Sequence, residues 1–204
     1  MRVARIEKPR KKPLQARAIA TVEAITRATA HILVEHGYDA LTTNHVAERA
    51  GVSIGSLYQY FPSKEALVGE LLDDYCDKMN ALFADVFMRS QALSPREVVR
   101  ATIRAIYLAK HKEPELFQVL IQQLPRLGRL KRHEEDMAQV TAMVQSYLEA
   151  HASELRVHDV PRAAQYTVEI GEGLTTLASL REKNADPEAV IEGISEIIDR
   201  YLFS

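Results

Sequence analysis

The sequence predicts an all-α fold of about nine helices, on three observations. Apolar residues recur every three or four positions along nearly the whole chain, which is the period of one helix face. Only eight glycines and eight prolines interrupt the 204 residues. No segment rich in Val, Ile and Thr alternates apolar with polar residues as a strand does. We expect a three-helix head with a helix-turn-helix, followed by a larger helical bundle.

The beginning of the chain is expected to be an arm followed by a helix. Residues 1–13 are basic, contain two prolines and lack an apolar period, which indicates a flexible arm. The first helix should run from about Leu14 to His36, and Gly37 should end it, because a glycine readily adopts the left-handed conformation found after a helix.

Later helices begin with recognisable capping residues. Ser63 precedes a long apolar-periodic segment that reaches about Ser90. The run Ser94-Pro95-Arg96-Glu97 offers a cap, a proline in the first helical position and an acid in the third. Asp186-Pro187-Glu188 repeats this pattern before the last helix. The predicted domains are therefore an arm (1–13), a helix-turn-helix domain (14–62) and a helical ligand-binding and dimerisation domain (63–204).

Charge is distributed unevenly along the chain. The formal net charge is −2, but residues 1–64 hold ten Lys and Arg against five Asp and Glu, while the remainder holds 16 against 23. A basic end followed by an acidic body suits a protein whose first domain faces a polyanion.

The segment 43–61 has the spacing of a helix-turn-helix. Ala47 lets two short helices approach closely, Gly51 permits the tight turn, and Leu57 anchors the second helix. The alternative is a helical hairpin packed inside a larger bundle. The residues left pointing outward are small, hydrogen-bonding or aromatic, as suits base edges and phosphates in a major groove. They are Thr43, Asn44, Ser53, Ile54, Gly55, Ser56, Tyr58, Gln59 and Tyr60.

The wider string resembles the tetracycline-repressor (TetR) family of bacterial regulators. The matching elements are the double threonine 42–43, Ala50-Gly51-Val52-Ser53, Gly55-Ser56-Leu57-Tyr58-Gln59-Tyr60-Phe61 and Lys64-Glu65-Ala66-Leu67, with the break at Gly37-Tyr38 before them. This resemblance covers about residues 15–70. It implies a homodimer with a DNA-binding head, a long connecting fourth helix and a body that holds a small-molecule pocket.

The resemblance also assigns roles by matched position. Thr43, Tyr58, Tyr60 and Lys64 are expected to anchor phosphates. The expected base-reading residues are Asn44, Ile54, Gly55, Ser56 and Gln59. Ser53 caps a helix whose free N–H groups favour phosphate. Arg10, Lys11 and Lys12 either enter an adjacent minor groove or form a solvated tail.

The body is expected to bind a small apolar or amphipathic effector. Met and aromatic side chains at helical spacing form ordinary core in most proteins, but they also line adaptable apolar cavities. The candidate ligand-binding residues are Tyr75, Met79, Phe83, Tyr107, His111, Phe117, Gln118, Tyr147, Glu169 and Thr176. Any of these could equally be core or surface residues.

The last two long helices, about 161–183 and 187–203, resemble the dimerisation pair of the family. A run of small residues permits close helix approach, and further residues supply apolar surface for a four-helix interface. The small residues are Gly171, Gly173, Thr175, Thr176, Ala178 and Ser179. The apolar residues are Leu174, Leu177, Leu180, Ile191, Ile194, Ile197, Ile198 and Leu202. The alternative is that these helices close the protomer's own core.

Catalysis and cofactors are not expected. The chain lacks the phosphate-loop, nucleophile-elbow and paired-histidine metal motifs, and its single cysteine, Cys76, lies among acids that raise a thiol pKa. We expect no metal site, no membrane span and a bacterial cytoplasmic location. The predicted function is a repressor released from a palindromic operator by its effector. The alternatives are an activator, an architectural DNA-binding protein without an effector, or a helical binding module without DNA affinity.

Overall fold

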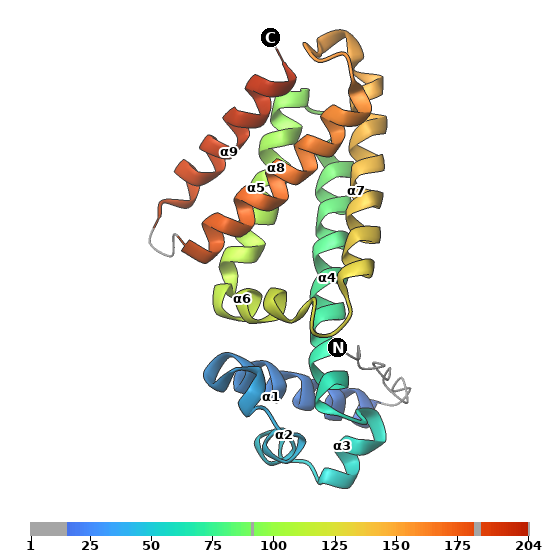
Figure 1. Cartoon of the computed structure of the whole chain (residues 1–204), viewed down its shortest axis with the longest axis vertical. Coiled ribbons are helices and arrows are strands. Elements are labelled where there is room, and N and C mark those ends of the chain that lie inside the picture. Colours follow the sequence, from blue (N-terminus) through green and yellow to red (C-terminus); the bar gives the residue numbers. More distant parts are fainter. Residues whose placement is uncertain (1–15, 91, 182–184, 204) are drawn as a thin grey trace. The chain divides into compact units, whose positions relative to one another are not determined.

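The computed structural model describes residues 16–90, 92–181 and 185–203, and it places nine α-helices in them (Figure 1). The all-α prediction is confirmed. The helices are α1 (Ala16–Ala40), α2 (Thr43–Ala50), α3 (Ile54–Tyr60), α4 (Lys64–Ser90), α5 (Pro95–Lys112), α6 (Pro114–Gln123), α7 (Leu130–Ala150), α8 (Val160–Arg181) and α9 (Pro187–Leu202). A short 3₁₀ turn, Ala152–Glu154, follows α7.

The predicted helix boundaries have identifiable causes. Gly37 interrupts α1 with φ 75°, a conformation that favours glycine. At the start of α5 the Glu97 carboxylate accepts hydrogen bonds from the N–H and the hydroxyl of Ser94, at 2.9 and 2.6 Å. Asp186 caps α9 by accepting the Glu188 N–H at 3.1 Å. These local interactions start α5 and α9 where the sequence pattern predicts them. The first helix was expected to end at about His36; Gly37 breaks it there, and helical structure resumes as far as Ala40.

The chain forms two compact units. The first unit contains residues up to 76 together with 115–130, and the second contains 77–114 and 131–204. Helix α4 contributes residues to both. Helix α6, although distant in sequence from the helix-turn-helix, belongs almost entirely to the first unit.

The first unit is built around one apolar cluster. Ile25, Ile32 and Leu33 of α1 are fully buried in it, and α4 adds Leu67 and Leu72. The α6 segment completes the cluster with Leu120, Leu124 and Leu127, which are at most 5% exposed. Because these leucines fill the same core as α1, α6 is a structural part of the helix-turn-helix unit.

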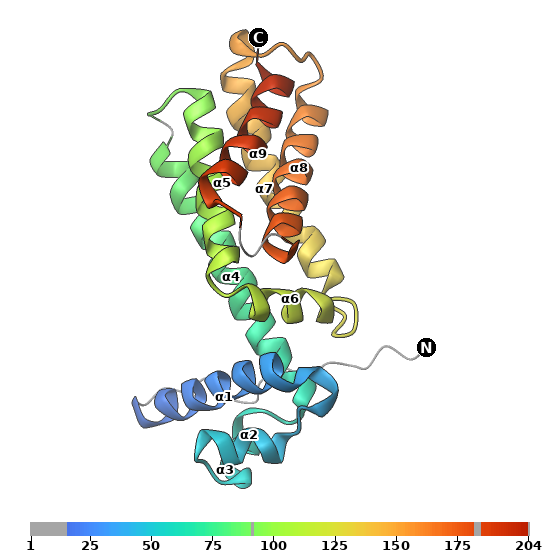
Figure 2. The same cartoon turned by 90° about the vertical axis from the view of Figure 1, so that its left-hand side faces the viewer.

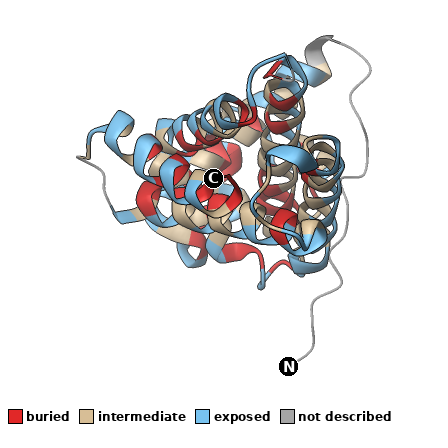
Figure 3. Ribbon diagram, turned by 90° about the horizontal axis from the view of Figure 1, so that it is seen from above, coloured by how far each residue is buried: buried red, intermediate tan, exposed pale blue. Residues whose placement is uncertain are grey.

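The second unit has its own core, in which α5 packs against α8 and α9 (Figure 2). Ile103 and Tyr107 of α5 and Ile191 and Ile198 of α9 are at most 5% exposed. The Ile103 side chain lies 3.1 Å from the position that a Cβ atom would take on Gly171, so glycine permits the close approach of α5 and α8. Buried residues lie where helices face one another (Figure 3).

The expected dimerisation surface is corrected by this packing. Ile191, Ile194, Ile198 and Leu202 belong to the protomer's own core, where none is more than 6% exposed. Gly171, Thr175, Ala178 and Ser179 are also buried within the unit. The sequence interpretation was wrong for these residues because α9 and α8 each have an inner face that packs on α5. Of the large apolar residues in the predicted surface, Leu177 and Ile197 remain exposed, at 44% and 50%, and Gly173 is exposed beside them.

Replacing Leu120 with alanine should destabilise the first unit by about 2–5 kcal/mol, because it leaves a cavity in a closed apolar cluster. Urea unfolding monitored by circular dichroism measures this loss. The matched control is Leu130→Ala at the start of α7, where leucine is 47% exposed and the expected change stays within about 0.5 kcal/mol. Equal effects in the two variants would contradict the placement of α6 in this core.

Candidate nucleic-acid interface and internal cavity

Helices α2 and α3 form the predicted helix-turn-helix. Thr42 caps α2 by accepting the His45 N–H at 3.2 Å, and Ser53 caps α3 by accepting the Ser56 N–H at 3.1 Å. Between them Gly51 adopts φ 67° and ψ 30°, the left-handed conformation. No atom lies within 4 Å of the position of a Cβ on Gly51, so the backbone angle, and not lack of space, favours glycine there.

The inner face of the motif is closed by small and apolar side chains. Val46 and Leu57 are fully buried, and Ala47 is 4% exposed. A seven-residue helix such as α3 is not stable on its own, so its position depends on the burial of Leu57. The opposite face of both helices is exposed to solvent. Its exposed members are Asn44, Ser53, Ile54, Gly55, Tyr58 and Gln59.

Two of the expected phosphate anchors meet on this surface. The Thr43 hydroxyl at the start of α2 and the Tyr58 hydroxyl on α3 lie 3.0 Å apart and share a hydrogen bond. One hydroxyl donates and the other keeps its proton free, so the pair can bind a single phosphate oxygen. The fold therefore brings residues 15 positions apart into one polar site.

Ser56 has a local role in addition to its expected contact with bases. Its N–H is bonded to the Ser53 hydroxyl, and the two hydroxyl oxygens lie 2.8 Å apart. Contact with a base therefore requires Ser56 to share its hydroxyl with the helix cap. Asn44 and Gln59 have exposed amide side chains, whose donor and acceptor pairs suit base edges.

Lys64 is held beside the motif by Tyr38. Its Nζ atom donates to the Tyr38 carbonyl oxygen at 3.3 Å and lies 4.6 Å from the centre of the Tyr38 ring. Arg126 lies on the same ring, with its guanidinium carbon 4.1 Å from the centre. The Lys64 ammonium carries three protons, so donors remain for a phosphate. Tyr60, the fourth expected anchor, is half-buried against the apolar cluster.

Tyr38 is a supporting residue to which sequence analysis gave no role. Its hydroxyl donates to the Glu65 carboxylate at 3.2 Å. Burial and the neighbouring Glu65 charge raise the pKa of Tyr38 to about 12, so the hydroxyl remains a donor at neutral pH. An aromatic residue directly after Gly37, which interrupts α1, was the available signal, but its partners come from distant segments.

Few cations face this surface. Arg49 is engaged by Glu35, which accepts its Nη2 proton at 2.8 Å, and this contact holds the pKa of the Glu35 carboxyl below its usual value. Arg10, Lys11 and Lys12 lie outside the described residues. The exposed residues of α3 are thus uncharged, while α2 exposes Glu48 and the paired Arg49, and Lys64 lies at the margin.

The second unit contains an apolar cavity of about 110 Å³ that is partly open to solvent. Met79 and Phe83 of α4, Ile106 of α5 and Tyr147 of α7 contribute to its wall. Glu172 of α8 also lines it and is the only acid or base with a full charge at neutral pH among the described lining residues. Sequence analysis identified Met79, Phe83 and Tyr147 as ligand candidates, and the structure brings these three together.

The other candidates lie outside this cavity. Tyr75 and Phe117 pack on each other in the first unit, with ring centres 5.7 Å apart. Gln118 belongs to that unit too. Tyr107 is buried in the core of the second unit and stacks on His111, with ring centres 5.3 Å apart. These five residues, which the sequence suggested as ligand contacts, therefore do not line the cavity.

Two further candidates on α8 also lie outside the cavity lining. Glu169 is exposed and bonded to Gln165 at 2.8 Å. Thr176 is half-buried and bonded to neighbouring polar groups. Glu169 precedes Glu172 by about one helical turn and Thr176 follows it by about one turn. Of these three residues, only Glu172 lines the cavity.

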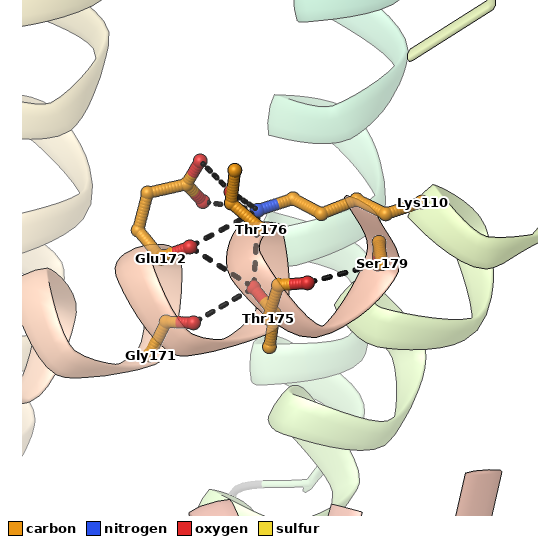
Figure 4. A network of polar contacts seen from close by, with 6 residues as sticks. All are labelled: Lys110, Gly171, Glu172, Thr175, Thr176 and Ser179. Atoms are coloured by element: carbon orange, nitrogen blue, oxygen red, sulfur yellow. Dashed lines mark hydrogen bonds and ion pairs between the residues drawn. The ribbon is translucent and has the colours of Figure 1, made fainter. Parts of the chain in front are cut away.

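A buried ion pair joins α5 to α8 beside the cavity (Figure 4). Lys110 is 3% exposed, and its Nζ atom donates to Glu172 Oε2 at 2.7 Å, Thr176 Oγ1 at 2.9 Å and Thr175 Oγ1 at 3.0 Å. Burial alone would raise the pKa of the Glu172 carboxyl. The Lys110 charge and the hydrogen bonds from Lys110 and Thr176 outweigh burial and hold that pKa below its usual value.

Sequence analysis missed this pair, although a signal was present. Lys110 follows Ile103 and Tyr107 at helical spacing, so it lies on the buried stripe of α5. A buried lysine requires an acid partner. The identity of that acid depends on how α5 and α8 pack, which periodicity within one helix does not reveal.

The described part of the chain carries neither of two other kinds of site. No group of three or more His, Cys, Asp or Glu side chains there could hold a metal ion. Among the helices drawn in Figure 1, none combines the length and the apolar character needed to cross a membrane.

Comparison with family models gives two matches. Residues 25–71 match the model described as bacterial regulatory proteins of the tetR family. Residues 94–202 match the model described as the C-terminal domain of tetracyclin-repressor-like proteins. The first match contains the helix-turn-helix, and the second contains most of the unit with the cavity.

Curated relatives match over part of their length. The uncharacterized HTH-type transcriptional regulator YuxN of Bacillus subtilis is 28% identical over 142 residues, which cover 68% of this chain and 46% of the relative. The HTH-type transcriptional repressor KstR2 of Mycobacterium tuberculosis is 30% identical over 109 residues, covering 52% of this chain and 54% of the relative. The chain thus spans about half the length of these relatives.

Solved structures share the fold at low sequence identity. A TetR-family regulator from Mesorhizobium loti superposes with a TM-score of 0.72 at 18% identity, covering 93% of this chain and 100% of that chain. This similarity concerns the fold alone.

Replacing Glu172 with glutamine should destabilise the protein by about 3 kcal/mol, because it leaves the Lys110 charge buried without a counter-charge. The loss lies at the lower end of the range for buried pairs because the Glu172 side chain is 30% exposed. Replacing both residues, as Lys110→Met with Glu172→Leu, should restore most of the stability. Urea unfolding of the two variants measures the difference, and equal losses would contradict the account of the pair.

The same pair predicts a pH dependence. Because the folded-state pKa of Glu172 is lowered, its contribution to stability is present above the ordinary value of 4.5 and is lost as pH falls through the lowered value. The double variant should therefore lose less stability than the wild type upon acidification below about pH 4.5.

Proposed function

The chain belongs to the TetR family of bacterial regulatory proteins, and on that premise we propose that it is a DNA-binding transcriptional repressor. The observation that carries the proposal is the exposed polar face of α2 and α3. Thr43 and Tyr58 form one hydroxyl pair on it, and the Asn44 and Gln59 amides are free to solvent. These groups suit the phosphates and base edges of a major groove.

Within this proposal the residues divide by task. Thr43, Tyr58 and Lys64 bind phosphates and set affinity. Asn44 and Gln59 distinguish bases through their amides, while Ile54 supplies an apolar contact and Gly55 allows the backbone to approach. Arg10, Lys11 and Lys12 of the arm add charge near the duplex. Because Arg49, the exposed cation of α2, is paired with Glu35, the arm and Lys64 carry the salt dependence.

We also propose that two copies associate through α8 and α9. Leu177 and Ile197 are large apolar side chains that are 44% and 50% exposed, one on each helix. Gly173 and Gly193 lie exposed on the same two helices, and a Cβ there would meet nothing within 4 Å. Dimers of this family typically bind operators, and a twofold arrangement would place two α3 helices about 34 Å apart on a palindromic operator.

The cavity of the second unit is the proposed effector site. Its wall is almost entirely apolar, and Met79 and Met137 give it adaptable side chains. Release from the operator would follow if the effector bound more tightly to a state of the dimer that does not fit DNA. KstR2 is a transcriptional repressor, and repression by this chain is part of the proposal.

Replacing Tyr58 with phenylalanine should weaken operator binding about fivefold, because one hydrogen bond of about 1 kcal/mol is lost. The salt dependence of binding should not change, because no charge is removed.

Replacing Lys64 with methionine should instead reduce the magnitude of the slope of log affinity against log salt by about 0.9 per subunit, because one charged phosphate contact is lost. Fluorescence anisotropy on a duplex obtained by selection from a random library measures both.

The control for both changes is Arg49→Met, since Arg49 is bound to Glu35; its salt slope should match that of the wild type. The phosphate assignments are overturned if neither Tyr58→Phe nor Lys64→Met changes binding. If the selection yields no preferred sequence while the protein still binds duplex, the protein is an architectural DNA-binding protein.

Replacing Leu177 and Ile197 together with glutamate should convert the dimer into a folded monomer at micromolar concentration, because charges would be buried in an apolar interface. Sedimentation velocity measures the mass, and circular dichroism checks the fold. Leu108→Glu is the control, since Leu108 is 39% exposed on α5. The interface proposal fails if the double variant remains dimeric.

A further inference from the structure

We infer that the effector is a small, uncharged apolar molecule with a hydrogen-bond-donating group, such as a hydroxyl, and that Glu172 accepts its proton. This inference rests on the proposed function of the cavity as an effector site. The hydrogen bonds around the buried ion pair and the polar atoms in the cavity wall support it.

Lys110 has no proton left for a ligand. An ammonium group carries three protons, and three acceptors lie within 3.0 Å of its Nζ atom: Glu172 Oε2, Thr175 Oγ1 and Thr176 Oγ1. Lys110 is also 3% exposed, and it is not part of the cavity wall. An anionic effector would therefore find no ammonium donor without breaking this network.

Glu172, by contrast, has acceptor capacity that faces the cavity. A carboxylate offers about four lone-pair positions. Lys110 uses one at Oε2, and the Thr176 hydroxyl uses one at Oε1 at 3.1 Å. The Glu172 side chain is 30% exposed and lines the cavity. A ligand that donates a proton can thus bind here and leave every existing contact in place.

The threonines fix this arrangement. Thr175 donates its own proton to the Gly171 carbonyl at 2.7 Å, so its oxygen can only accept from Lys110. Thr176 donates to Glu172 and accepts from Lys110 in the same way. Figure 4 shows the resulting chain of contacts, in which each hydroxyl proton already has an acceptor. The network therefore presents an acceptor to the cavity and no donor.

The charge of the effector follows from the charge of the pair. Lys110 and Glu172 neutralise each other, so a charged ligand would bring an uncompensated charge into an apolar cavity. This holds for an ammonium as well as for a carboxylate. The cavity thus selects against both, and a neutral ligand avoids the cost.

Two more atoms of the wall indicate that the ligand carries a second polar atom. Thr102 Oγ1 and Tyr147 Oη are buried, line the cavity and have no hydrogen-bond partner in the structure. Buried hydroxyls without partners are rare in proteins. A carbonyl, ether or hydroxyl oxygen of the ligand would satisfy them. The volume of about 110 Å³ is of the same order as the cavity of about 150 Å³ that holds benzene, so a ligand with one ring fits once the adaptable Met79 and Met137 side chains move.

Four probes with one ring and different end groups test the inference at pH 8: benzyl alcohol, ethylbenzene, the benzylammonium ion and benzoate. The full-length protein carries ¹³C-methyl methionine. Signals of Met79 and Met137 report binding in the cavity, and Met88, which is 60% exposed, is the reference outside it. Benzyl alcohol should bind at least tenfold more tightly than either charged probe.

The double variant Lys110→Met with Glu172→Leu tests the role of Glu172. The affinity of benzyl alcohol relative to ethylbenzene should fall at least fivefold in this variant, while Glu169→Gln, outside the cavity on the same helix, should keep the wild-type ratio. Should the double variant not fold, the comparison of charged and neutral probes on the wild type still decides the matter.

The possible failures are distinct. If benzoate or benzylammonium binds as tightly as benzyl alcohol, or if the double variant keeps the wild-type ratio, the inference about the end group is overturned and the effector cavity stands. If none of the four probes shifts Met79 or Met137, the effector cavity itself is overturned, and the inference with it.

Discussion

The burial of Leu57 is the constraint on which the proposed DNA surface depends. Helix α3 has seven residues and too few hydrogen bonds to be stable alone, so its position follows from a fully buried leucine and the cap at Ser53. Once Leu57 points inward, the helical period directs Gly55, Tyr58 and Gln59 outward. The contact between Tyr58 and Thr43 then follows from the turn at Gly51.

A second constraint acts in the unit that holds the cavity. Lys110 is buried between α5 and α8 and must keep its charge compensated, which fixes Glu172 beside it. The same contact that joins the two helices places one carboxylate in a wall whose other described residues are uncharged. Structural stability and the chemistry offered to a ligand therefore depend on one ion pair.

The sequence predicted features that depend on local interactions. Helix starts at Ser94 and Asp186, the break at Gly37 and the buried positions Ala47 and Leu57 follow from capping, backbone angles and periodicity, and the structure confirms them. What depends on packing between distant helices was not predictable in this way. Ile191 and Ile198 were assigned to a dimer surface because periodicity gives an apolar face but not its partner.

Amide chemical shifts of the labelled protein, recorded while a selected duplex is added, test most directly whether α2 and α3 bind DNA. The expected result is that the largest changes occur at Thr43, Asn44, Gly55 and Gln59, with few changes in α5 and α9. Changes centred on α8 and α9, with α3 unaffected, would contradict the assignment of this surface to DNA.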